Sequence, residues 1–319
     1  MSDLSRFNHI ESVYWVFTQL CNDSCAHCYN NSGPQGERMS TDECMRIIDH
    51  LPEKIDRLIL SGGEPLAERT LLFEVLSRIQ QRYGKQTQIM LQTNGDLLTG
   101  EILDRLIEHG VSRFDIASID RYHRHKGERL DELAELFASR GVSDEEQDAL
   151  VDRQRYLHET PLSWGYWGAN EDFWLGGNWA RGRAYENDIW MMDGSHNFCA
   201  KPSGAVGFLT GTDEVMQEIS IQLWKLNPCC PGTKDPLGDV REEPVPEILA
   251  RYAKNPVFQK LNEGDPYRMG ERFGISEAHA RERAHELQNV CRWCDEFFEK
   301  HYDIRKQRAC ARSETDTAA

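Results

Sequence analysis

Short apolar segments alternate with helical segments along the first half of the chain, and this rhythm limits the possible folds more than any other feature. In Glu11–Phe17 the apolar side chains of Val13, Trp15 and Phe17 take alternate positions, which is the period of a β-strand. Further strands are predicted at Arg57–Leu60, Gln88–Gln92, Phe114–Ser118 and Leu162–Trp167, and helices at Thr70–Tyr83, Gly100–His109 and, in two pieces, Glu128–His158. Strand-then-helix units with short loops predict an α/β fold in which helices wrap a parallel sheet through right-handed crossovers.

Another helix is predicted between the first two strands. Ser40 or Thr41 fits its N-cap, and the apolar residues that follow recur at helical spacing. Cys44 is one of these residues, so we expect it to be a small core residue rather than a metal ligand.

The chemically distinctive residues fall in the loops that follow the predicted strands. These loops hold Cys21, Cys25 and Cys28 after the first strand, Ser61-Gly62-Gly63-Glu64-Pro65 after the second, Thr93-Asn94-Gly95 after the third and Ser118-Ile119-Asp120 after the fourth. In parallel α/β folds the functional groups gather on the loops at the carboxyl ends of the strands. The sequence therefore predicts one site at that end of the sheet.

Three thiols lie close together in the first of these loops, with three and then two residues between them. A structural zinc ion would be closed by four ligands. A four-iron cluster held by only Cys21, Cys25 and Cys28 would instead keep one iron open, and thiolates on one short loop suit iron–sulfur ligation. The loop is too tight for a relaxed disulfide. A zinc loop or unrelated thiols remain the alternatives on spacing alone.

Together with Gly62-Gly63-Glu64-Pro65 after a strand, this loop resembles that of the radical S-adenosylmethionine (radical SAM) enzymes. Their motif has three cysteines at this spacing and usually an aromatic residue just before the third, a position that His27 fills here. The resemblance implies a partial (β/α)6 barrel and an open iron that chelates the amino and carboxylate groups of SAM. It also implies that the glycine-rich stretch supplies backbone groups to the ammonium of SAM.

The same resemblance suggests which side chains surround the cofactor. The candidates for SAM binding are His27, Tyr29, Gly62, Gly63, Glu64, Pro65, Asn94, Ser118, Asp120 and Arg183. Asn94 could also be only part of a turn, and Asp120 only a helix cap. Arg183 lies in a Gly-Arg-Ala segment, where its fork matches a pair of oxygens of SAM or substrate. The alternative for Arg183 is a glycine-rich turn with surface arginines.

A second set of cysteines follows residue 190, where the strand–helix rhythm stops. Cys199, one residue of the pair Cys229-Cys230, and the closing Cys291-x-x-Cys294 make four ligands, the number that saturates an iron–sulfur cluster. Spacing does not separate Cys229 from Cys230, and Cys230 is favoured. The arrangement resembles the one-cluster auxiliary domain called the twitch domain, a shortened form of the SPASM domain. A structural zinc ion on the same thiolates is the alternative.

The predicted organisation of the 319 residues is a radical SAM partial barrel (1–190), a small α+β auxiliary-cluster domain (191–310) and a disordered tail (311–319). No apolar run approaches the roughly 20 residues that span a bilayer, and Met1–Asn8 lacks the apolar core of a signal peptide. Ten cysteines without an export signal favour metal binding over disulfides, so we expect a reducing cytoplasm. A net charge of −16 argues against nucleic acid as a main partner.

The resemblance also implies the chemistry. The cofactors are expected to be a SAM-binding 4Fe–4S cluster, one auxiliary 4Fe–4S cluster and SAM, which is cleaved to a 5′-deoxyadenosyl radical. A flavodoxin- or ferredoxin-type protein would supply the electron. The barrel starts near residue 11, without the leader-binding domain of peptide-modifying relatives. We therefore expect a small polar metabolite such as a sugar, aminocyclitol or nucleoside, with oxidation favoured over radical elimination or rearrangement. The alternatives are a peptide- or protein-modifying enzyme and a non-catalytic metal-binding module; no catalytic acid or base is assigned.

Overall fold

The computed structural model describes residues 4–116, 128–144, 162–166, 179–200, 207–212 and 215–304. In this part of the chain nine strands form one sheet in the order β5-β6-β4-β3-β2-β1-β7-β8-β9. The strands are β1 (His9–Val16), β2 (Lys54–Ser61), β3 (Gln88–Thr93), β4 (Val111–Ile116), β5 (Ser143–Asp144), β6 (Ser163–Tyr166), β7 (Glu218–Gln222), β8 (Lys225–Asn227) and β9 (Gly238–Asp239). Strands β1 to β7 pair in parallel, whereas β8 is antiparallel to both β7 and β9. The predicted α/β class with a parallel sheet is confirmed.

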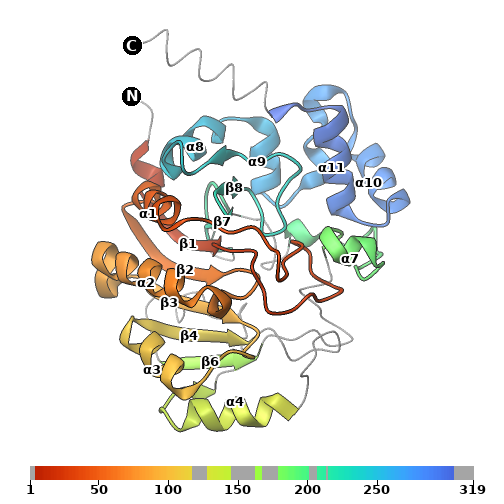
Figure 1. Ribbon diagram of the computed structural model, residues 1–319. Coiled ribbons are helices and arrows are strands. Elements are labelled where there is room, and N and C mark those ends of the chain that lie inside the picture. The colour runs from red at the N-terminus through yellow and green to blue at the C-terminus, as the bar shows by residue number, and fades with distance from the viewer. Residues whose placement is uncertain are drawn as a thin grey trace.

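The helices fall into two groups on either side of the β1–β7 pairing (Figure 1). The first group is α1 (Thr41–His50), α2 (Arg69–Tyr83), α3 (Gly100–Glu108) and α4 (Glu128–Ala138), and the second is α7 (Gly182–Glu186), α8 (Val245–Tyr252), α9 (Pro256–Asn262), α10 (Glu277–Glu286) and α11 (Val290–Lys300). Ser40 is the N-cap of helix α1. Its hydroxyl accepts from the Glu43 amide, and the Glu43 carboxylate accepts from the Ser40 amide. This capping box satisfies amides that the helix leaves unpaired. Cys44 is fully buried in the core, as predicted.

One face of the sheet is apolar. The register aligns Ile221, Trp15, Leu60, Leu91, Phe114 and Trp164 across neighbouring strands. All six side chains belong to the buried hydrophobic core, which also contains Ile47 of α1, Leu72 of α2 and Leu103 of α3. Burial of this face against α1 to α3 is the main source of fold stability, because each large apolar side chain contributes roughly 1.5–3 kcal/mol.

The opposite face of the sheet is largely polar. Because side chains alternate along a strand, the residues between the core positions point the other way. They include Ser12, Tyr14, Arg57, Ser61, Gln88, Gln92, Arg113, Asp115, Ser163, Glu218, Ser220 and Gln222. A sheet with one apolar face and one polar face encloses a polar interior when it curves.

The sheet takes in strands that the sequence pattern did not predict. Strand β7 lies parallel to β1, and the Trp15 indole N–H donates to the Leu223 carbonyl at 2.9 Å. Residues Ser143–Asp144, which lie within the Glu128–His158 stretch predicted as two helices, form the short strand β5. The second helix expected in Glu128–His158, the residues Ser118 and Asp120, and the tail at 311–319 lie outside the described residues. None of the described helices is both long and apolar enough to cross a bilayer.

Candidate functional site

The three predicted ligand cysteines lie in the loop that leaves β1. The Cys21 amide donates to the Gly33 carbonyl at 2.9 Å and the Cys28 amide to the Cys25 carbonyl at 3.2 Å, so the loop folds back on itself. Burial, with a smaller contribution from the charges of Glu64 and Cys28, raises the pKa of Cys21 to about 12. Three neighbouring thiolates are therefore unfavourable without a compensating cation, and an iron cluster would supply that charge.

No three Cys, His, Asp or Glu side chains in the described ranges converge closely enough to hold a single metal ion. A four-iron cluster places each cysteine on a different iron, so its ligands do not need to meet at one point. The donor set of Cys21, Cys25 and Cys28, all free thiols, therefore fits such a cluster better than a single ion.

The glycine-rich loop after β2 packs directly on the cysteine loop. The Gly63 amide donates to the Thr18 carbonyl and the Glu64 amide to the Leu20 carbonyl, both at 2.8 Å. A Cβ atom on Gly63 would lie 2.4 Å from the Leu20 carbonyl oxygen, which precedes Cys21. Both amides are therefore already hydrogen-bonded within the protein. An ammonium group only donates hydrogen bonds, so the carbonyl oxygens of this loop are the backbone groups suited to bind it.

Substitution Gly63→Ala is expected to disturb the three-cysteine loop, because backbone atoms of Leu20 cannot move aside as a side chain would. We expect iron bound at this loop to be largely lost and the free energy of unfolding to fall by about 1–3 kcal/mol, as in other overpacked sites. Iron content and chemical unfolding measure the two effects. The control is Gly274→Ala, where a Cβ would meet nothing within 4 Å but the φ of +73° strains alanine, so that some stability should be lost while the iron content stays unchanged. Equal iron content in both variants would contradict the expectation.

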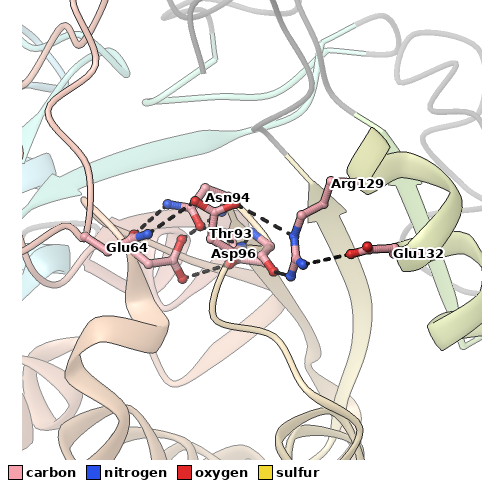
Figure 2. A network of polar contacts seen from close by, with 8 residues as sticks. Glu64, Thr93, Asn94, Asp96, Arg129 and Glu132 are labelled. Atoms are coloured by element: carbon pink, nitrogen blue, oxygen red, sulfur yellow. Dashed lines mark hydrogen bonds and ion pairs between the residues drawn. The ribbon is translucent and has the colours of Figure 1, made fainter. Parts of the chain in front are cut away.

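Glu64 joins the loops that follow β2 and β3 (Figure 2). Its carboxylate accepts from the Leu66 amide at 2.9 Å, and from the Thr93 hydroxyl and the Asn94 amide, both at 2.7 Å. Asn94 in turn donates from its side chain to Asn22 of the cysteine loop at 2.7 Å. Burial raises the pKa of Glu64 to about 7, against the lowering effect of these donors. Glu64 and Asn94 thus position the loops of the site, and their contact with SAM stays a prediction.

Substitution Glu64→Gln is expected to lower the free energy of unfolding by about 1–3 kcal/mol. Either orientation of the amide places an N–H group against a donor of Leu66 or Asn94. The control is Glu132→Gln at the other end of the network in Figure 2, where the carboxylate is 72% exposed and paired with Arg129 at 3.2 Å. Such an exposed pair contributes at most about 1 kcal/mol, so similar unfolding curves for both variants would exclude the positioning role.

The segment at the start of α7 is hydrogen-bonded to the backbone of the cysteine loop. Arg183 donates from Nε to the Cys25 carbonyl at 2.9 Å and from Nη2 to the Ser32 carbonyl at 2.5 Å. The Ala184 amide donates to the Cys28 carbonyl at 3.3 Å. Gly182 has φ of +50°, and a Cβ there would lie 2.5 Å from the Tyr29 carbonyl oxygen. Arg183 therefore secures the loop backbone, and its predicted contact with SAM remains a prediction.

Three more of the predicted SAM-site residues that the structure describes lie in the same loops. His27 is buried within the cysteine loop, and Tyr29 is half-buried. Pro65 begins the short 3-10 helix Pro65–Glu68, where the Glu64 side chain caps the Leu66 amide. Ser118 and Asp120 lie outside the described residues.

The second set of cysteines lines one cavity. Its walls include the thiols of Cys199, Cys229, Cys291 and Cys294, together with Arg181 and the apolar Trp179, Phe198 and Leu261. The two cysteines of α11 are three residues apart and so lie on one face of the helix. Burial raises the pKa of all four thiols, that of Cys291 to about 11. Four thiols around a cavity whose other walls are mostly apolar, with Arg181 as the one charged residue among the described residues that line it, fit a group held by thiolates.

The geometry favours Cys229 over Cys230, the residue that the sequence analysis preferred, and the identity of the fourth ligand stays a prediction. Cys230 does not line the cavity; its sulfur lies 3.7 Å from the Tyr29 hydroxyl, and its carbonyl accepts from the Gln222 side chain. Cys229, the alternative, lies among the other three thiols. Consecutive residues after a strand point in different directions, and spacing alone could not show which thiol faces α11.

Comparison with known proteins identifies the first part of the chain. Residues 15–143, which include the cysteine loop and the glycine-rich loop, match the sequence profile of the Radical SAM superfamily. The chain contains a radical SAM domain.

Two curated relatives share this domain. The chain is 42% identical over 115 residues to an AdoMet-dependent heme synthase of Methanosarcina barkeri, a match that covers 34% of this chain and 30% of the relative. It is 36% identical over 112 residues to a pre-heme d1 synthase of Dinoroseobacter shibae, covering 34% of this chain and 26% of the relative. The matches thus span less than a third of the relatives' length.

Solved structures resemble a larger part of the chain at low identity. BtrN in complex with AdoMet and 2-DOIA is 17% identical with a TM-score of 0.49, and the match covers 84% of this chain and 90% of BtrN. Native anSMEcpe with bound AdoMet and Cp18Cys peptide is 14% identical with a TM-score of 0.44, covering 96% of this chain and 99% of that one.

The polar face of the sheet in and beside the radical SAM domain carries residues that the sequence analysis overlooked. The Ser12 hydroxyl donates to Glu218 at 2.7 Å, and Arg57 donates to both Ser12 and Glu218 at 3.2 Å. In a second group Arg113 donates to Asp115 at 3.0 Å and to Ser163 at 3.2 Å. The signal was present in the alternation of the strands, which places these polar residues opposite the core positions.

Proposed function

We propose that this chain is a radical SAM enzyme that abstracts a hydrogen atom from a small polar metabolite. Cys21, Cys25 and Cys28 would hold the SAM-binding 4Fe–4S cluster, and a flavodoxin- or ferredoxin-type protein in the cytoplasm would reduce it. The single observation that carries the proposal is the packing of the glycine-rich loop on the three-cysteine loop at the carboxyl end of β1 and β2. That packing brings together the two elements of the radical SAM motif.

A reduced cluster held by Cys21, Cys25 and Cys28 would supply the electron that cleaves bound SAM to methionine and a hydrogen-abstracting 5′-deoxyadenosyl radical. The chain's own residues hold the loops in place. Glu64 ties the glycine-rich loop to the β3 loop, and Arg183 fixes the carbonyl groups of Cys25 and Ser32. Helices α1 to α3 pack against the apolar face of the sheet. The polar side chains lie on the opposite face.

We further propose one auxiliary 4Fe–4S cluster on Cys199, Cys229, Cys291 and Cys294, in a twitch-like domain that follows the barrel. This proposal is supported by four free cysteines from three separate segments that line one cavity. Such a cluster could accept the second electron from a substrate radical, so net oxidation of the substrate is the reaction we favour. Radical elimination or rearrangement would leave the cluster's oxidation state unchanged at the end of each turnover.

The polar interior face favours a sugar, aminocyclitol or nucleoside as substrate. Tyr14 donates to Ser61 at 3.0 Å on this face, and the Arg57–Glu218 pair, whose side chains are partly exposed, lies on it as well. Hydroxyl, amine and carboxylate groups of a substrate would exchange hydrogen bonds with such side chains. A tetrapyrrole is the second candidate, because two relatives are named as an AdoMet-dependent heme synthase and a pre-heme d1 synthase.

The test is an anaerobic assay of the iron-reconstituted chain with dithionite and SAM, in which 5′-deoxyadenosine is quantified. Deuterated sugars, aminocyclitols, nucleosides and tetrapyrroles are then supplied separately, and deuterium in 5′-deoxyadenosine identifies the class that loses the hydrogen atom. Deuterium from a polyol or nucleoside supports the proposal. Deuterium transfer from a tetrapyrrole alone would contradict the small polar metabolite and identify a tetrapyrrole as the substrate. Failure to form 5′-deoxyadenosine would contradict the proposed radical SAM activity itself.

A further inference from the structure

One buried cation borders the cavity of the four thiols. Arg181 is among the residues that line this cavity, and its side chain is only 17% exposed. Its Nη2 donates to Asp295 at 2.9 Å, and Nη1 donates to the Ala180 carbonyl at 3.1 Å. Asp295 follows Cys294 on α11 but does not line the cavity. The positive member of the pair therefore faces the thiols, and the negative member lies behind it.

The guanidinium acts on several of the thiols. Burial raises the pKa of Cys199, Cys229 and Cys291, and the Arg181 charge opposes that rise for each of them. The geometric basis is that Arg181 lines the same cavity as these thiols and is held there by Asp295. Charge interactions are stronger here than at the surface, because little water screens them.

A cluster on four thiolates is an anion, and its reduction adds one more negative charge. A fixed positive charge beside it stabilises the reduced state more than the oxidised state and so raises the reduction potential. A fixed negative charge has the opposite effect. Net charge and solvent exposure are among the factors that set the potentials of iron–sulfur clusters.

We propose that the Arg181–Asp295 pair sets the reduction potential of the auxiliary cluster, with Arg181 raising the potential and Asp295 limiting that rise. The inference rests on the proposed auxiliary cluster and adds the residues that tune it. Neither residue is a ligand; both act through their charge on the group that the four thiols hold. The pair would thereby determine how readily the cluster accepts an electron from a substrate radical.

The test uses the full chain with Cys21, Cys25 and Cys28 replaced by alanine, so that only the four-thiol site binds iron. In this parent, redox titration followed by electron paramagnetic resonance gives the potential of the remaining cluster. Substitution Arg181→Gln should lower that potential, and Asp295→Asn should raise it. The opposite signs separate a charge effect from a general loosening of the site, which would shift both variants in the same direction.

A matched control is available on the same helix. Glu296, the residue after Asp295, pairs with Arg283 of α10 at 2.8 Å, and the Arg283 side chain is 28% exposed. Substitution Arg283→Gln removes the same charge from an arginine–carboxylate pair that does not line the cavity. We expect the potential to stay at the parent value.

Shifts of opposite sign with an unchanged control support the inference, and equal potentials or shifts of one sign overturn it. Should Arg181→Gln fail to retain iron, Asp295→Asn decides: a potential at or below the parent value rejects the role of the pair. A parent that binds no iron would instead reject the auxiliary cluster itself, so the two failures are distinguishable.

Discussion

Replacement of Cys229 by alanine is expected to remove the auxiliary cluster, about four irons per chain, whereas Cys230→Ala should leave the iron content unchanged. The thiol of Cys229 lines the cavity with three other cysteines, while that of Cys230 lies 3.7 Å from the Tyr29 hydroxyl. Loss of one of four ligands opens the cluster to solvent and to oxidative loss. Adjacent substitutions of the same residue type make each variant the control for the other.

Iron analysis and the visible absorption of anaerobically purified protein measure this result. Equal iron loss in both variants would show that cluster binding depends on the conformation of the whole loop after β8. It would contradict the assignment of Cys229 as the specific ligand. Iron loss only in Cys230→Ala would reverse the assignment and place Cys230 in the cavity.

The Cys21/Cys25/Cys28→Ala triple variant is expected to lose all SAM cleavage and yet to keep about four irons per chain. The cysteine loop and the four-thiol cavity lie in different segments, so removal of one ligand set leaves the other thiols in place. Formation of 5′-deoxyadenosine should fall to the level seen without reductant, because no open iron remains to bind SAM.

A suitable control is Cys44→Ala, since this thiol is fully buried in the hydrophobic core and belongs to neither set. It should retain full iron content and SAM cleavage. Near-zero iron in the triple variant would contradict the auxiliary cluster, and undiminished 5′-deoxyadenosine would contradict the assignment of the three cysteines to SAM.

Local signals predicted the parts of the fold that depend on neighbouring residues. The alternation of Val13 and Trp15 indicated β1, and Ser40 was one of two predicted caps for α1. Both depend on geometry within a few residues, which the sequence carries directly. The positions of the site loops followed from the same pattern, since loops after parallel strands meet at one end of the sheet.

Features that depend on distant contacts could not be predicted in this way. The pairing of β7 with β1 joins residues more than two hundred positions apart. In the part of the chain that the structure describes, β7 is followed by β8 and not by a helix, so it does not continue the strand–helix pattern. The choice between Cys229 and Cys230 depends on how the β8–β9 hairpin faces α11. The contact of Arg183 with the Cys25 carbonyl likewise requires the folded path of the segment around residue 180.

The short segment 181–184 lies against both proposed metal centres, through different residues. Arg181 borders the four-thiol cavity, whereas Gly182, Arg183 and Ala184 contact the backbone of the three-cysteine loop. One short segment of backbone therefore contacts both proposed centres. Any change that lengthens or shortens this stretch alters the gap an electron must cross, so the spacing between the centres is under the control of a single short piece of backbone.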